Sequence, residues 1–125
     1  MKYLLIHHID ETLLNAWEDG EAVFDPEDDR EMEAWDEEMD RRGILVGGGR
    51  LALPRTATTL RVRDGELLIT DGPFAETKEQ IAGYCILECD DLDQAIEISA
   101  RHPTVRFGTF ELRPYTAVSI TEDGH

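Results

Sequence analysis

The sequence predicts a single α+β domain, and three observations point to it. The chain has 125 residues, enough for one domain with a core of its own. Short apolar runs alternate with two amphipathic segments of helical spacing, and Asp-Gly dipeptides at 64–65 and 71–72 separate apolar runs. The order strand, helix, strand, hairpin, strand, helix, strand is typical of a ferredoxin-like antiparallel sheet with two helices on one face, here with an inserted hairpin.

Four segments are predicted to form the main sheet because they are short, apolar and bounded by turn residues. Gly47-Gly48-Gly49 fall inside the second of them. A glycine loop that binds phosphate is followed directly by a helix. Strand-like residues follow here instead, so we predict a bend or a bulge. The four segments are residues 2–9, 44–53, 82–90 and 105–114.

Two segments are predicted to be helices that cover one face of this sheet. Asp25-Pro26 begins the first, over residues 27–42, because a capping Asp followed by Pro favours a helix start. Asp90-Asp91 caps the second, which Pro103 ends. The side chains predicted to face the core recur at helical spacing. They are Met32, Trp35 and Met39 in the first helix and Leu92, Ala95, Ile96, Ser99 and Ala100 in the second.

The connections are predicted from their turn residues. Residues 58–70 form a hairpin, since Asp64-Gly65 between apolar runs is a strong hairpin signal. Residues 10–26 form an acidic connection with one helical turn in it. Thr77 and Gln80 have the spacing of a capping box, which predicts another helical turn. We treat residues 1–125 as one domain, in which 115–125 supply an edge strand and a frayed acidic tail.

The charge and the cysteines exclude several classes of protein. The net charge is −16, and 15 of the 28 acidic residues lie between Asp10 and Asp40. Binding to nucleic acid requires a basic stripe, which the sequence lacks. No apolar run approaches the length of a membrane span. Cys85 and Cys89 are too far apart along one strand for a disulfide, which suits a reducing compartment, so we expect a cytoplasmic protein.

The segment from Thr70 to Tyr84 carries more specialised side chains than a turn needs. Asp71 either accepts backbone hydrogen bonds within its own turn or, beside Phe74 in an apolar cleft, acts as a general base with a raised pKa. Lys78 and Glu79 either line a polar cleft wall or belong to an ion network at a subunit interface. Their candidate ionic partners are Arg50, Glu111 and Arg113.

Neither a metal nor a cofactor is predicted. The four histidines lack the convergent spacing of a zinc site, and the acidic clusters do not follow a calcium-loop pattern.

The 82–90 strand is apolar on both sides, so the sheet face that the helices leave open is predicted to pack against a second copy of the chain. We therefore expect a homodimer.

The string "TATTLRVRDGELLITDGPFAETKEQIAGYCILECDDLDQAIEISARHP" resembles the DGPF-domain branch of the YCII-related family, as do "RRGILVGGGRL" and "FELRP". The resemblance implies a dimeric α+β barrel with a small-molecule cleft, and proton-transfer chemistry on a small cyclic or anionic compound without a cofactor. Residues 27–42 lack the histidine of the family's histidine–aspartate pair. His7 or His8, at the end of the first strand, is the substitute that the sequence offers.

Two functions follow as hypotheses. In the first, the protein is an isomerase or lyase in which Asp71 is the acid or base and His8 its proton partner. Phe74 then forms an apolar wall, and the residues that orient the substrate are Arg50, Lys78, Glu79 and Arg113. In the second, it is a non-catalytic regulatory protein, linked to sigma-factor regulation by the resemblance, whose acidic helix 27–42 docks a basic partner.

Overall fold

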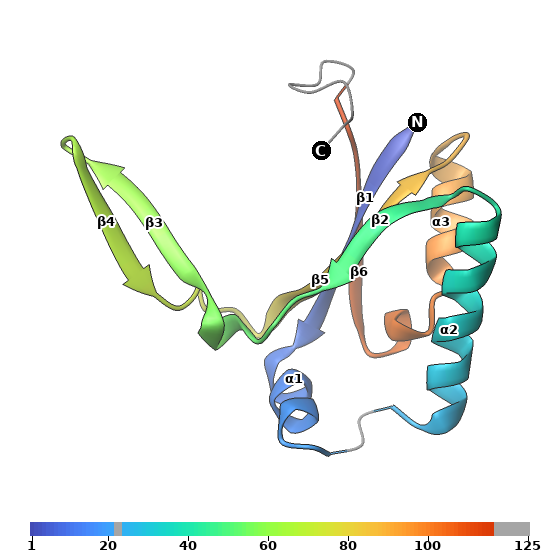
Figure 1. Ribbon diagram of the computed structural model, residues 1–125, viewed down its shortest axis with the longest axis horizontal. Coiled ribbons are helices and arrows are strands. Elements are labelled where there is room, and N and C mark those ends of the chain that lie inside the picture. The colour runs from blue at the N-terminus through green and yellow to red at the C-terminus, as the bar shows by residue number, and fades with distance from the viewer. Residues whose placement is uncertain (22–23, 117–125) are drawn as a thin grey trace.

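The computed structural model describes residues 1–21 and 24–116, and its main sheet has the predicted topology (Figure 1). Four antiparallel strands lie in the order β2-β5-β1-β6, and β3 and β4 form a separate hairpin between β2 and β5. Helices α2 and α3 lie on the same side of the sheet. The ferredoxin-like α+β fold is thereby confirmed. The elements are β1 (Lys2–Asp10), α1 (Glu11–Glu18), α2 (Pro26–Arg41), β2 (Leu45–Arg50), η1 (Pro54–Thr56), β3 (Thr58–Arg63), β4 (Glu66–Asp71), β5 (Glu79–Glu88), α3 (Leu92–Ala100), η2 (Pro103–Arg106) and β6 (Gly108–Pro114).

The core lies between the sheet and the two long helices. The odd-numbered residues Tyr3, Leu5 and Ile9 of β1 are buried against it, because successive side chains of a strand point to opposite faces. The predicted stripe of α2 is confirmed at Trp35 and Met39, which are buried. In α3 the predicted core positions Ala95 and Ser99 are buried, together with Ile98. Leu92, Ile96 and Ala100 are exposed, so their predicted core positions were wrong.

The glycine-rich strand and the Asp-Gly turn behave as predicted. The register of β2 against β5 shifts between Leu45 and Gly47, which marks a bulge. At the hairpin tip, Asp64 and Gly65 have φ values of 52° and 77°, so both central residues of the turn are left-handed. That conformation matches the twist of the two strands that it joins.

Three connections differ from the prediction. Residues 11–18 form a complete helix, whose first turn Asp10 caps by accepting a hydrogen bond from Thr12 N at 2.7 Å. The helical turn at 77–81 was wrong: β5 begins at Glu79, and Gln80 Nε2 donates to Thr77 O at 3.2 Å without any helix. A short 3₁₀ helix, η2, delays the last strand to Gly108. The predicted edge strand at 115–120 and the tail fall mostly outside the described residues.

Gly108 is expected to tolerate no side chain, because it lies against the central strand. A Cβ atom at this position would be 2.2 Å from the carbonyl oxygen of His8, which is backbone and cannot rotate away. We expect Gly108→Ala to lower the free energy of unfolding by about 3 kcal/mol, at the upper end of overpacking costs. Gly49→Ala is the matched control, since its Cβ would have no neighbour within 4 Å. Urea titration would measure both variants, and equal losses would contradict the expectation.

In the described part of the chain, no helix combines the length and the apolar character that crossing a bilayer would need.

Candidate functional site

A cavity of about 690 Å³ lies between the sheet and the helices. Its floor comes from β1, β2 and β5, and its walls come from α1, α2 and the η2 region. The volume is within the range of small-molecule sites, and much of the lining is apolar or aromatic, as such sites usually are. The apolar lining residues include Leu14, Trp17, Phe24, Met32 and Phe107.

Two histidines form part of the cavity lining. The rings of His7 and His102 lie 5.1 Å apart between centroids. His7 stacks on Phe110 at 4.4 Å, and His102 packs edge-on against Trp35 at 4.7 Å. Burial lowers the pKa of each histidine to about 4, and nearby positive charge contributes to the lowering. Both rings are therefore neutral at pH 7, each with one nitrogen that accepts a proton.

The tautomer of His102 follows from its backbone contact. Thr104 N donates to His102 Nδ1 at 3.2 Å, so His102 caps the η2 helix. A nitrogen that accepts a hydrogen bond has no proton of its own, and the neutral ring then carries its proton on Nε2. His102 is thus a hydrogen-bond donor through Nε2.

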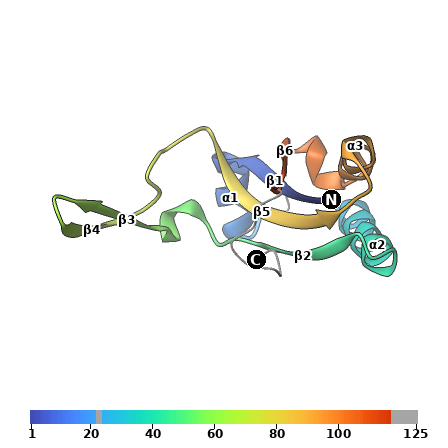
Figure 2. The ribbon, with the colours of Figure 1, turned by 90° about the horizontal axis from the view of Figure 1, so that it is seen from above.

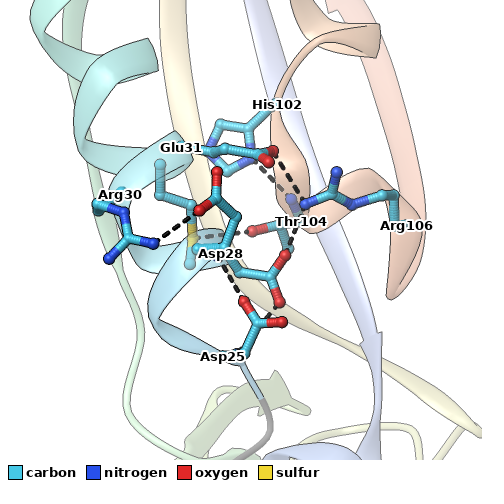
Figure 3. A network of polar contacts seen from close by, with 9 residues as sticks. Asp25, Asp28, Arg30, Glu31, His102, Thr104 and Arg106 are labelled. Carbon is cyan, nitrogen blue, oxygen red and sulfur yellow. Dashed lines mark hydrogen bonds and ion pairs between the residues drawn. The ribbon is translucent and has the colours of Figure 1, made fainter.

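An ion cluster holds the η2 helix against the start of α2 (Figure 3). Arg106 Nη2 lies 2.7 Å from Asp28 Oδ1 and 3.1 Å from Glu31 Oε2. Asp28 also closes the capping box of α2 with Asp25. These contacts lie at the surface, where each pair contributes at most about 1 kcal/mol. Their main consequence is positional, because they fix the segment that carries His102.

Cys85 is the third polar group near the histidines. Its Sγ lies 3.8 Å from His7 Nε2. Burial, with a smaller effect from Asp36, raises the pKa of the thiol to about 12. The thiol is therefore protonated at neutral pH, whereas a nucleophilic cysteine would need to be a thiolate. Its role at this site is a polar contact to His7.

Asp36 and Arg50 line the same cavity from α2 and from the end of β2. Both residues are exposed overall, which places their charged groups where the cavity meets solvent. The Arg50 guanidinium carbon lies 3.9 Å from the centre of a Trp17 ring, a cation–π contact. Partial burial raises the pKa of Asp36, and Arg50 opposes that rise. Glu37 and Asp40 of α2 also line the cavity, so the lining presents the cation of Arg50 together with three carboxyl groups of α2.

The structure separates the seven residues that the sequence predicted for the site. Arg50 lines the cavity. Asp71 lies at the exposed end of β4, and Phe74, just after it, is 78% exposed. His8, Lys78 and Glu79 line a second hollow. The remaining residue, Arg113, is exposed on β6.

The contacts around the second hollow form a polar cluster on the sheet face opposite the one that lines the cavity. His8 Nε2 lies 3.0 Å from Glu111 Oε1, and Glu79 Oε1 accepts a hydrogen bond from Thr109 Oγ1 at 3.0 Å. The predicted pair of Asp71 with His8 does not occur among the described contacts. The catalytic and substrate-orienting roles of these residues remain predictions.

Sequence reasoning named His7 as an alternative to His8 but missed His102, Asp36 and Cys85. His7 shares its strand face with the buried Leu5 and Ile9, because alternate residues of a strand point to the same side. This signal could have been read from the sequence. Asp36 follows Met32 by four residues, which places both on the same side of α2. His102 had no comparable signal, because the turn that brings it beside His7 depends on packing.

Among the described residues, no cluster of three or more His, Cys, Asp or Glu side chains could hold a metal ion.

Comparisons with known proteins agree with the fold. Residues 1–119 match the model of a family described as the YCII-related domain. An uncharacterized protein of Rhizobium meliloti (strain 1021), R00369, is 35% identical over 120 residues, which cover 91% of each chain. A solved structure of 5-chloro-2-hydroxyhydroquinone dehydrochlorinase (TftG) from Burkholderia phenoliruptrix AC1100, in complex with 2,5-dihydroxybenzoquinone, superposes with a TM-score of 0.51 at 14% identity. It covers 93% of this chain and 94% of its own. The likeness shows a shared fold, that of the dimeric α+β barrels.

Proposed function

Since the chain belongs to the YCII-related domain family, we propose that it is a cofactor-free isomerase or lyase that acts on a small cyclic, anionic compound. The observation that carries the proposal is the pair of neutral histidines on the wall of a ligand-sized cavity. The fold of a dehydrochlorinase crystallised with a dihydroxybenzoquinone gives further support, because that protein is similar in architecture.

In the proposed reaction, His7 takes a proton from the substrate and returns it at another atom or to a leaving group. A ring with a pKa near 4 is a weak base that releases its proton readily, so the proton that His7 takes must be an acidic one on the substrate. His102 would donate from Nε2 to an oxygen on which negative charge develops. Arg50 at the opening would attract an anion, and Trp17 beside it offers an aromatic face to a ring.

We assign proton transfer to His7 in preference to the pair of Asp71 and His8. Asp71 is exposed on the hairpin and does not contribute to the lining of the cavity. His8 follows His7 directly in β1, so its side chain points to the opposite face of the sheet. Proton transfer inside the cavity requires a group that the bound molecule touches.

The proposal includes a homodimer formed through the open face of the sheet. Leu4 and Ile6 of β1 and Tyr84 and Ile86 of β5 alternate with buried core residues and are only half buried. An apolar sheet face of this kind is normally covered by another layer. A second copy of the chain would supply that layer.

Binding of 2,5-dihydroxybenzoquinone tests the proposal, since it is a small anionic ring at neutral pH. A ligand that binds only the folded state raises the melting temperature. We expect a concentration-dependent rise for the wild type and a Kd at least 10-fold weaker for Arg50→Gln, because the variant lacks the charge at the opening. Arg41→Gln on the exposed end of α2 is the matched control and should bind like the wild type.

Two results would count against the proposal: no thermal shift with this probe, or equal binding by Arg50→Gln and the wild type. Either would favour the alternative, a regulatory protein that docks a basic partner on the acidic surface of α2. Acidic residues of that helix, such as Glu33, Glu37 and Asp40, are exposed.

A further inference from the structure

The hairpin β3–β4 projects from the domain as an arm (Figures 1 and 2). It leaves the sheet on the side away from α2 and α3. All residues of the two strands are exposed except Thr59, which is half buried. An isolated two-stranded hairpin is at best marginally stable in water. A hairpin that is built this way therefore needs a surface to pack on.

One face of the arm is apolar and the other is mixed. The register pairs Leu60 with Ile69 and Val62 with Leu67, so these four side chains share one face. Each of them is between 58% and 63% exposed. The opposite face pairs polar and charged residues with one aliphatic side chain, as Thr59 with Thr70, Arg61 with Leu68 and Arg63 with Glu66.

The size of the apolar face is that of an interaction site. Four aliphatic side chains exposed to this extent form a patch of roughly 300–400 Å². Exposed apolar patches of this size are often binding surfaces. Two arms, each packed on a receiving surface of similar area, would bury on the order of 1,200–1,600 Å². Stable protein interfaces begin at about this area.

The charge of the arm favours a second copy of this chain as the partner. The chain carries −16, so two copies repel each other over most of their surface. Residues 54–71 carry three arginines and three acids and are neutral. The arm is thus a part of the surface that approaches another copy without net repulsion.

We propose that the arm of each copy packs the face of Leu60, Val62, Leu67 and Ile69 onto the other copy, reciprocally across a twofold axis. The arm holds the dimer together from outside, in addition to contact between the open sheet faces. This inference rests on the proposed homodimer. It adds that the inserted hairpin supplies a large part of the association free energy. Contact between the four-stranded sheets alone would give a weaker dimer.

Paired substitutions on one strand test the arm. Leu67→Lys/Ile69→Lys places two charges on the apolar face, and Leu68→Lys places one on the opposite face of the same strand, where Leu68 is also exposed. Sedimentation velocity across protein concentrations would measure the dimer Kd. We expect the double variant to weaken dimerisation at least 100-fold and Leu68→Lys less than 3-fold, with unchanged far-UV circular dichroism for both.

A third variant separates the arm from the sheet interface. Ile6→Lys changes the open face of the sheet, where Ile6 is half buried. If Ile6→Lys dissociates the dimer and the arm variant does not, the arm proposal is overturned while the dimer stands. If the wild type is a monomer at micromolar concentration, both are overturned. Binding of 2,5-dihydroxybenzoquinone is a separate readout, so a failure of the proposed chemistry leaves the arm test intact.

Discussion

Acidification from pH 7.5 to pH 5.5 is expected to remove about 3 kcal/mol of folding stability, through His7 and His102. Burial holds the pKa of each near 4 in the folded protein, against an ordinary value near 6.5. As the pH falls below 6.5, the unfolded chain takes up protons that the folded chain does not. Stability is therefore complete above pH 6.5 and declines as the pH falls toward 4. At pH 5.5 the loss is about 1.4 kcal/mol for each histidine.

The structural reason lies in the contacts that a proton would disturb. His102 Nδ1 accepts a hydrogen bond from Thr104 N, which a protonated nitrogen could not do. A charge on either ring would also repel a charge on the other, 5.1 Å away, and Arg50 disfavours a charge on His7. Carboxylates of ordinary pKa stay ionised down to pH 5.5, so this interval isolates the histidines.

Urea unfolding at both pH values would measure the effect, and two variants assign it. In His102→Asn the amide oxygen can still accept the hydrogen bond from Thr104 N, and we expect the acid loss to fall by about half. His8→Gln is the control on the opposite sheet face, beside Glu111, and should keep most of the loss. Full acid sensitivity in His102→Asn would contradict the assignment.

The sheet topology could be predicted from the sequence because local patterns determine it. The apolar run in residues 2–9 specifies a strand, and the Asp64-Gly65 turn specifies a hairpin. The stripe at Trp35 and Met39 specifies a helix and the face that it buries. The order of such elements leaves few topologies for an antiparallel sheet with two helices. Helix α1 was predicted only as a single turn, since its acidic surroundings masked a short apolar face, of which Leu14 is the buried residue.

The candidate site could be predicted only in part. Of the predicted site residues, Arg50 lines the cavity, but the specialised DGPF turn drew attention to Asp71 and Phe74, which are exposed at the end of β4 and just after it. Turn residues identify local geometry, whereas the cavity arises where β1, α2 and the η2 region meet. The distance between His7 and His102, 95 positions apart in the sequence, is a property of that packing alone.

Replacing Trp35 by alanine is expected to have the largest effect of any substitution considered, about 5 kcal/mol. Its side chain is 3% exposed, and the loss of a buried Trp costs about 3–5 kcal/mol through lost burial and the cavity left behind. Trp35 Nε1 also donates to the carbonyl oxygen of Ile98 at 2.9 Å, which joins α2 to α3. The Ile98 carbonyl still accepts a hydrogen bond from Arg101 N at 3.2 Å in the variant, so loss of the indole hydrogen bond adds only about 0.5–1.5 kcal/mol. Small domains have only about 5–15 kcal/mol to lose.

Trp35→Phe separates the two contributions, because it keeps a ring in the core and removes the donor. We expect it to cost about 1–2 kcal/mol, from the lost indole hydrogen bond and the smaller ring, since Arg101 N still donates to the Ile98 carbonyl. Trp17→Ala is the control: Trp17 is only half buried and lines the cavity, so its loss should weaken ligand binding more than folding. Since the Trp35 ring also packs against His102, Trp35→Ala should loosen the histidine and reduce the acid sensitivity described above. Urea titrations of the three variants at pH 7.5 and pH 5.5 would measure both effects, and a Trp35→Ala protein as stable as Trp17→Ala would show that α2 is not anchored through this indole.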